Sequence, residues 1–217
     1  SAGEGHAVAL TKTGDVVAWG DNYYGQCSVP IGLEKVIAIS TKDDHTVALK
    51  QNGEVVAWGW NEYGQCDVPA DLGNVVEISA GSAHTVALKG NGEVLAWGYN
   101  EDGRCNIPMG LVNAVAISAG GAHTVAINEN GKVVAWGIND NGQCNVPANL
   151  GNIVAISAGS AHTVALKEDG TIVVWGLNDY GQCNVPIDFK KVVTKRYPEH
   201  INPIDVQEGE MSFILAE

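Results

Sequence analysis

The stretch HTVALKGNGEVLAWG, residues 84–98, decides the fold of this chain. Its two apolar runs, HTVALK and EVLAWG, are rich in β-branched residues, and Asn91-Gly92 between them is typical of a tight hairpin turn. A third run of the same kind, VVEIS at 75–79, precedes them after a small, flexible segment. The sequence therefore predicts an antiparallel sheet of at least three strands.

This unit is repeated along the chain at a constant spacing of 39 residues. Tryptophan, cysteine and histidine each recur five times at that spacing, and each of these tryptophans is followed by glycine. The markers are Trp19, Trp58, Trp97, Trp136 and Trp175; Cys27, Cys66, Cys105, Cys144 and Cys183; and His6, His45, His84, His123 and His162. A fixed period of this length identifies a repeat array, in which each unit is one supersecondary element.

The two faces of the predicted sheet differ in bulk. Side chains alternate along a strand, so Val86 and Leu88 share one face while Thr85 and Ala87 share the other. Copies of such a sheet can stack with the large face of one against the small face of the next. We therefore expect an all-β fold, a β-propeller of three- to four-stranded blades, and an open β-solenoid is the alternative.

The repeats cover residues 1–186, and a divergent segment follows at 187–217. Ser1 falls in the middle of a repeat, which indicates that further repeats preceded it. KKVVTK at 190–195 corresponds to the first strand that is missing before Ser1, and MSFILAE at 211–217 aligns with AHTVALK at 83–89. We expect five to six blades, with 187–217 closing or capping the array, and leave open that the chain is part of a larger ring.

The charge of the chain limits its partners. With 12 basic and 25 acidic residues the formal net charge is −13, which argues against nonspecific binding to nucleic acid or to an anionic membrane. A basic or neutral partner is favoured. The sequence contains no apolar run long enough for a membrane span, and the stretch from Ser1 lacks the charged and apolar regions typical of a signal peptide.

The repeated histidines and cysteines indicate scaffold rather than chemistry. Each repeat holds one histidine and one cysteine, without the paired spacing of a zinc site, and equivalent positions in neighbouring blades are too far apart for disulfides. We expect the histidine to fix the start of a strand and the cysteine to fill a small apolar slot. We expect no catalytic residue, metal or cofactor, because a catalytic group is unique in a chain whereas these residues are copied.

The positions that differ between repeats are better candidates for binding. They lie two, four and five residues after each tryptophan, around an invariant asparagine such as Asn61, and the repeat symmetry places them on one side of the propeller. Rigid aromatic anchors beside acidic residues are typical of a protein-binding patch. An alternative is that these rings only pack between blades. The expected binding residues are Tyr23, Tyr24, Trp60, Glu62, Tyr63, Tyr99, Glu101 and Tyr180.

The recurring order VVAWG, NxxGQ, VP and HTVAL resembles the repeats of the regulator of chromosome condensation family, over residues 1–186. The compact WGDNYYGQ at 19–26 is most similar to bacterial members, which include secreted β-lactamase inhibitory proteins of the propeller type. The resemblance implies a propeller of usually seven blades, a binding role, and a secreted or cell-surface location.

The leading hypothesis is a noncatalytic module that binds a protein partner. One alternative is β-lactamase inhibition, but the inhibitors use aromatic residues in the loop before the histidine, which here reads GEG, KDD, GSA, GGA and GSA. Others are guanine nucleotide exchange, which the short units disfavour, carbohydrate binding through stacking on Trp60, Tyr63 and Tyr99, and a purely structural array.

Overall fold

The computed structural model describes residues 1–186, which form strands β1 to β14 in five antiparallel sheets. Blade 1 comprises β1 (His6–Leu10) and β2 (Val16–Gly20). Blades 2 and 3 comprise β3 (Val36–Lys42), β4 (His45–Lys50) and β5 (Val55–Gly59), then β6 (Val75–Ala80), β7 (His84–Lys89) and β8 (Val94–Gly98). Blades 4 and 5 comprise β9 (Ala114–Ala119), β10 (His123–Asn128) and β11 (Val133–Gly137), then β12 (Ile153–Ala158), β13 (His162–Lys167) and β14 (Ile172–Gly176).

The predicted all-β blade architecture is confirmed. Blades 2 to 5 each hold three strands, with the HTVAL-type strand in the middle. Nothing within residues 1–186 forms a helix with the length and hydropathy that a membrane span needs. The strand expected at 190–195, the copy expected at 211–217 and the closing role expected of 187–217 lie outside the described residues.

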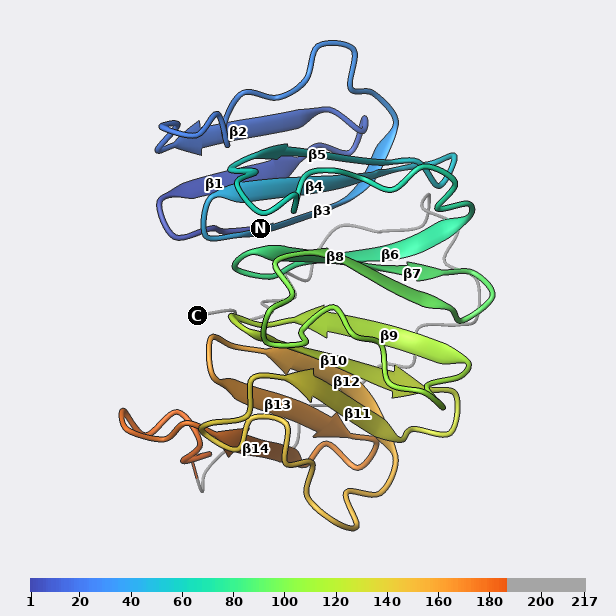
Figure 1. Cartoon of the computed structure of the whole chain (residues 1–217), viewed down its shortest axis with the longest axis vertical. Helices are drawn as coiled ribbons and strands as arrows, with labels where there is room; N and C mark the ends of the chain where they lie inside the picture. Colours follow the sequence, from blue (N-terminus) through green and yellow to red (C-terminus); the bar gives the residue numbers. More distant parts are fainter. Residues whose placement is uncertain (187–217) are drawn as a thin grey trace.

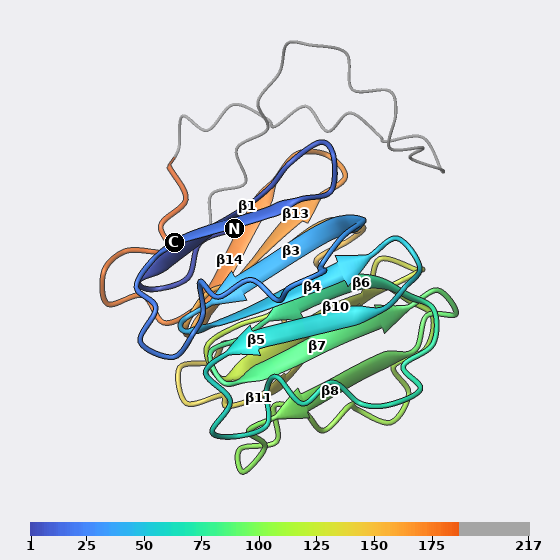
Figure 2. The same ribbon diagram turned by 90° about the horizontal axis from the view of Figure 1, so that it is seen from above.

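The blades follow one another in chain order and form an arc. Blade 1 and blade 5 lie at opposite ends of the long axis in Figure 1, whereas the view from above shows both displaced to the same side of the middle blades (Figure 2). Lys42, at the end of β3, reaches across this arc, and its ammonium lies 3.4 Å from the carbonyl oxygen of Ala158 in blade 5. The first strands of the blades therefore face a common centre.

Each blade contains the predicted hairpin. In blade 2 the amide of Gly53 donates to the carbonyl of Lys50 at 2.9 Å, and the amide of Lys50 donates to Glu54 at 2.8 Å. Gly53 has a φ of 81°, while Asn52 stays outside the left-handed region. The Asn-Gly pair thus ends a type I turn followed by a left-handed glycine, which is a common hairpin connection. The face of the array formed by these turns is called the turn face below.

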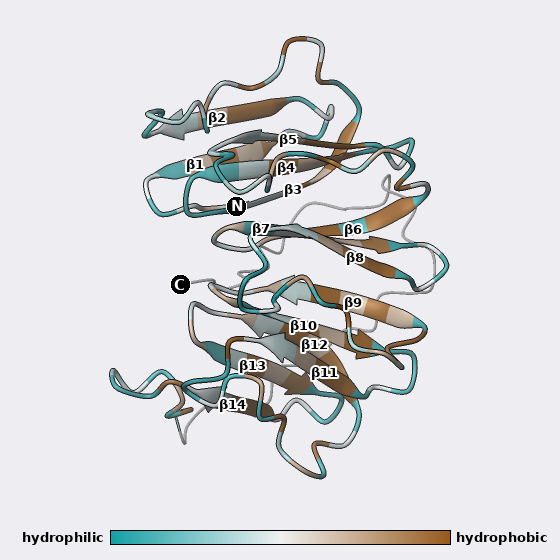
Figure 3. Ribbon diagram, viewed as in Figure 1, coloured by the Kyte–Doolittle hydropathy of each residue, from teal (hydrophilic) through white to brown (hydrophobic). Residues whose placement is uncertain are grey.

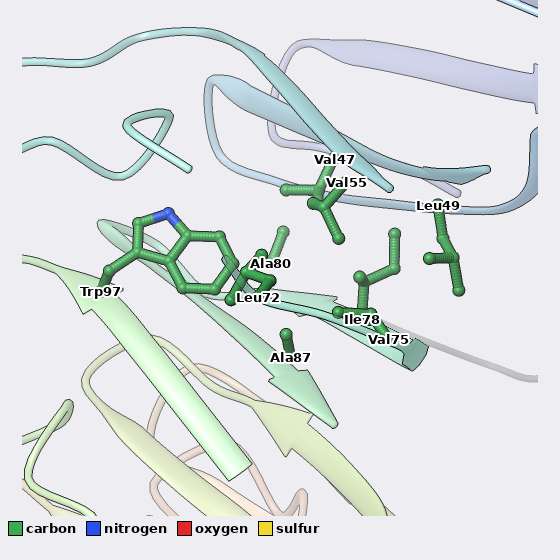
Figure 4. Packing of buried hydrophobic residues seen from close by; sticks show 9 residues of the cluster. All are labelled: Val47, Leu49, Val55, Leu72, Val75, Ile78, Ala80, Ala87 and Trp97. Atoms are coloured by element: carbon green, nitrogen blue, oxygen red, sulfur yellow. The ribbon is translucent and has the colours of Figure 1, made fainter. Parts of the chain in front are cut away.

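Neighbouring blades pack large face against small face, as the strand alternation predicts. Val47 and Leu49 of β4 share one buried cluster with Ala87 and Trp97 of blade 3 (Figure 4). The same arrangement recurs between blades 3 and 4 and between blades 4 and 5. Hydrophobic residues accordingly lie along the strands and hydrophilic ones in most connecting loops (Figure 3). Every inter-blade layer therefore has its own apolar core.

A short chain of hydrogen bonds also joins each blade to the next. The carbonyl oxygen of Gln65 accepts from Thr85 Oγ1 at 2.8 Å and from Trp97 Nε1 at 3.0 Å, both in blade 3. His45 Nε2 of blade 2 lies 3.1 Å from the same Thr85 hydroxyl. Because that hydroxyl uses its one hydrogen toward the carbonyl, His45 Nε2 must carry a hydrogen and donate it. Equivalent links join His6 to Thr46, His84 to Thr124 and His123 to Thr163.

Two glycines of the repeat are required by close contacts. A Cβ on Gly81 would lie 2.1 Å from Cε1 of His84, so the imidazole occupies the space that a side chain would need. Gly59, after the repeated tryptophan, has a φ of 104°, and a Cβ there would lie 2.4 Å from the carbonyl oxygen of Asp44. The end of the third strand is thereby held against the start of the second.

Replacing Thr85 by valine tests the link between blades 2 and 3. The variant keeps the shape of the side chain but leaves the buried His45 Nε2 without its acceptor and removes one donor to Gln65, so we expect the free energy of unfolding to fall by about 1–3 kcal/mol. Chemical denaturation followed by tryptophan fluorescence measures it. The exposed Thr171→Val variant is the control and should change stability by less than about 0.5 kcal/mol. Equal effects in the two variants would contradict the assigned link.

Buried titratable groups make stability depend on pH in two opposite ways. Burial lowers the pKa of His45 and His123 from 6.5 to about 4, and that of His84 to about 3. Glu77 stands where blades 2, 4 and 5 have alanine, and burial raises its pKa from 4.5 to about 7, although a hydrogen bond from the backbone of Ile117 offsets part of the rise.

The sign of each contribution follows from linkage. Below pH 6.5 the unfolded chain takes up protons on the three histidines that the folded chain refuses, so acid destabilises the fold. Between pH 4.5 and about 7 folded Glu77 holds a proton that the unfolded chain has lost, so this group destabilises the fold as pH rises through that window.

Glu77→Ala isolates the second effect. We expect this variant to be more stable than the parent at about pH 8 by an amount on the order of 2 kcal/mol, because an ionised, half-buried carboxylate is removed, and to show a smaller gain at about pH 5. Denaturation at both pH values measures the difference. The exposed Glu34→Ala variant should show no such pH-dependent gain, and a Glu77→Ala gain that is the same at both pH values would contradict the assignment.

Candidate functional site

The loop that follows the third strand of each blade is built around an asparagine. In blade 2 the Oδ1 of Asn61 accepts from the amide of Cys66 at 2.7 Å, and its Nδ2 donates to Asp67 at 2.7 Å. The same bond to the cysteine amide is made in the other repeats by Asn22, Asn100, Asn139 and Asn178. The predicted turn-building role of this asparagine is confirmed. The face of the array that carries these loops is called the loop face.

A glutamine fixes the tip of the loop. Gln65 is fully buried, and its Oε1 accepts from the amide of Tyr63 at 3.0 Å. Its main-chain carbonyl is the group held by Thr85 and Trp97 of the next blade. One residue therefore ties the variable tip to the constant part of the structure.

The cysteines differ from the expected apolar slot. Each is a half-buried free thiol, and in blade 2 the Sγ of Cys66 donates to the main-chain oxygen of Trp60 at 3.3 Å. Burial, together with the neighbouring Asp67, raises the pKa of the Cys66 thiol to about 12. The thiol thus completes the loop as a weak hydrogen-bond donor, because the loop turns a carbonyl toward it.

Five of the predicted residues form a continuous line of rings, called the aromatic row: Tyr23, Tyr24, Trp60, Tyr63 and Tyr99. Successive ring centroids lie 4.8, 6.1, 5.2 and 4.8 Å apart. Contacts within one loop alternate with contacts between loops of neighbouring blades. Tyr24 of blade 1 meets Trp60 of blade 2, and Tyr63 of blade 2 meets Tyr99 of blade 3. The row thus crosses blades 1 to 3.

The rings of the aromatic row remain accessible. Tyr23, Tyr24 and Tyr63 are 82%, 46% and 44% exposed, and Trp60 and Tyr99 are partly exposed. The rings thus pack on one another across blades while keeping part of their surface in solvent. Glu62 and Glu101 are exposed in the same loops. Tyr180 of blade 5 is 93% exposed but does not join the row. Blade 4, which lies between, has Ile138 and Asn141 at the positions where blade 2 has the rings Trp60 and Tyr63.

Arg104, which ends the row in blade 3, was not predicted, and its partner Asp102 stands at one of the variable positions without being among the expected binding residues. Arg104 replaces the buried glutamine of the other repeats, and its Nε donates to both oxygens of Asp102 at 2.8 and 3.0 Å. Its guanidinium carbon lies 4.9 Å from the centroid of the Tyr99 ring. Burial alone would raise the pKa of Asp102, but the bonds from Arg104 bring it below its ordinary value. The change from GQC to GRC in the third repeat was the available signal.

The hydroxyl of Tyr99 completes this end of the row. It donates to Glu101 at 2.9 Å, and this bond, with burial, raises the pKa of Tyr99. Within residues 1–186 no three histidine, cysteine or acidic side chains come together as metal ligands would. The arrangement therefore offers stacking surfaces, carboxylates and one paired guanidinium on a rigid loop.

Comparison with solved structures places the fold among known propellers. Human WBSCR16 matches with a TM-score of 0.72 and 21% identity over 80% of this chain and 61% of that one. Prp20p of Saccharomyces cerevisiae matches with a TM-score of 0.72 and 24% identity, over 86% of this chain and 58% of that one. The CR4 receptor kinase ectodomain of Physcomitrella patens matches with a TM-score of 0.69 and 26% identity, over 81% of this chain and 51% of that one. This chain therefore spans between 51% and 61% of the length of these structures.

Comparison of sequences identifies the repeat itself. No curated protein matches the chain by sequence. A family model described as the regulator of chromosome condensation (RCC1) repeat matches residues 1–26, 36–65, 75–104, 114–143 and 153–182. These five segments coincide with the five blades and cover most of the chain, so the protein belongs to the RCC1 repeat family of β-propellers.

Proposed function

We propose that this chain is a noncatalytic protein-binding module whose partner docks on the aromatic row of the loop face. The observation that carries the proposal is the continuity of the row, in which five partly exposed rings from three blades touch in sequence. Partly exposed aromatic side chains on a surface are the residues that most often dominate the binding energy of protein interfaces.

The scaffold makes the row suitable for binding. Asn61 and Gln65 hold the loop of blade 2 by hydrogen bonds that do not involve the variable side chains. A pre-organised loop loses little conformational entropy when a partner docks, so more of the contact energy appears as affinity. The relative Prp20p is described as binding Gsp1p and histones, which supports a role in protein binding.

The other functions considered receive less support. The loops before the repeated histidines carry no aromatic residue, which disfavours β-lactamase inhibition of the known kind. Guanine nucleotide exchange rests on the family resemblance alone. Carbohydrate binding shares the stacking chemistry of Trp60, Tyr63 and Tyr99, and the experiment below separates it from protein binding.

Site-specific photo-cross-linking tests the proposal. A photoreactive amino acid replaces Glu62 in one variant and Glu54 in another. Both positions are exposed in blade 2, but Glu62 lies on the loop face and Glu54 on the turn face. We expect position 62 to cross-link one defined protein from the native host extract, identified by mass spectrometry. Position 54 should not.

The triple replacement Trp60→Ala, Tyr63→Ala and Tyr99→Ala should abolish this cross-link by removing the stacking surface, with an unfolding midpoint close to that of the parent. The matched triple variant Lys50→Ala, Lys89→Ala and Lys132→Ala on the turn face is the control and should cross-link as the parent does. Unchanged cross-linking in the aromatic variant would contradict the proposal, as would a neutral oligosaccharide that binds the row while no protein is captured.

A further inference from the structure

The charges of the described residues are segregated between the two faces of the array. On the loop face the basic side chains are Lys42, which is directed across the centre of the arc, and Arg104, which is paired with Asp102. Acidic residues lie on the loop face of all five blades, and those of blades 1 to 3 are near the aromatic row. They are Glu4, Asp21, Asp43, Asp44, Glu62, Asp67, Glu101, Asp102, Asp140 and Asp179.

The turn face is much closer to neutral. All the remaining lysines of residues 1–186 lie there, and acidic neighbours balance them: Lys50 pairs with Glu54 at 2.7 Å and Lys89 with Glu93 at 2.9 Å. These lysines are Lys12, Lys35, Lys50, Lys89, Lys132 and Lys167. The net negative charge of the described blades is therefore concentrated on the face that carries the aromatic row.

Blade 3 shows how this face accommodates a cation. The guanidinium of Arg104 lies against the ring of Tyr99 and between carboxylate oxygens of Asp102. Stacking on an aromatic ring and pairing with a carboxylate are the two interactions that arginine makes most favourably at a surface. The chain itself thus provides one example of an aromatic ring and a carboxylate holding a guanidinium.

Blade 2 also offers a ring and a carboxylate, but in a different arrangement and without the cation. Trp60 and Glu62 occupy the positions of Tyr99 and Glu101, whereas Tyr63 and Gln65 stand in place of Asp102 and Arg104. The Trp60 ring contacts Tyr24 and Tyr63, so it extends the stacking surface toward blade 1. Among residues 1–186 the loop face has no further basic side chain to stack on this part of the row, because Lys42 reaches across the arc and Arg104 is paired with Asp102.

We propose that the loop face binds an extended protein segment rich in arginine or lysine, laid along the aromatic row from blade 1 to blade 3. This inference rests on the proposed function and specifies its partner. The cationic side chains of the bound segment stack on Trp60, Tyr24 and Tyr63. They pair with Glu62 and the neighbouring carboxylates. The row corresponds to about six residues of extended chain, at roughly 3.3–3.6 Å per residue.

Fluorescence anisotropy with a labelled peptide of alternating arginine and serine, about nine residues long, tests the inference. We expect binding that weakens strongly when the salt concentration rises from about 0.1 M to about 1 M, since the Debye length falls from about 10 Å to about 3 Å. A peptide with citrulline in place of arginine keeps the shape without the charge and should bind at least about tenfold more weakly.

A pair of matched double variants locates the site. The double variant Glu62→Gln, Glu101→Gln removes two negative charges from the loop face, while the amide oxygen at position 101 can still accept from the Tyr99 hydroxyl. We expect this variant to bind the peptide at least about fivefold more weakly. Glu54→Gln with Glu93→Gln removes the same charges from the same blades on the turn face and should change binding by less than about twofold. Trp60→Ala should weaken binding by about tenfold.

The possible failures are distinguishable. Equal losses in the two double variants, or equal binding of the arginine and citrulline peptides, would overturn the inference. If the partner captured through position 62 is cross-linked through a segment without basic residues, the inference fails while the proposed binding function stands. If the loop face captures no protein and binds only a neutral oligosaccharide without salt dependence, both fail.

Discussion

The main-chain carbonyl seven residues after the repeated tryptophan is the group on which the rest of the structure depends; it belongs to glutamine in blades 1, 2 and 4 and to Arg104 in blade 3. In blade 2 the carbonyl of Gln65 accepts from Thr85 and Trp97 of blade 3, and His45 donates to the same threonine. An unpaired buried carbonyl is costly, so this group favours one position of the next blade over all others. The large face of blade 2 then meets the small face of blade 3, with the tryptophan over it. Repetition of this one joint explains the constant spacing of the motifs.

The same glutamine connects architecture to the proposed binding role. Its carbonyl belongs to the joint, while its side chain holds the loop tip at Tyr63. Side chains at the tip are free to vary because Asn61 and Gln65 bond to the main chain rather than to them. The effect of this joint is visible where it is missing: no described blade precedes blade 1, and Trp19 is 55% exposed whereas Trp58 of blade 2 is 8% exposed.

Much of this architecture could be predicted from the sequence because a repeat multiplies each weak signal. Strand alternation in HTVALK predicted the packing of Val47 and Leu49 on Ala87. The asparagine and the variable positions predicted a shared loop face. Side-chain contacts beyond this strand packing could not be predicted. Lys42 reaching Ala158 and Tyr63 meeting Tyr99 depend on the rotation from one blade to the next, and Arg104 stacking on Tyr99 depends on the detailed shape of one loop.

The loop tip varies without affecting the joint beneath it. The most direct measurement is the free energy of unfolding of a chain in which blade 4 receives the tip of blade 2, through Ile138→Trp, Asp140→Glu and Asn141→Tyr. The main-chain amide of residue 141 donates to the side-chain oxygen of Gln143 at 2.9 Å, and this hydrogen bond holds the tip. The three changes leave it in place. The account predicts a change of less than about 1 kcal/mol. A loss of about 3 kcal/mol or more would show that tip and joint are not separable, and would contradict it.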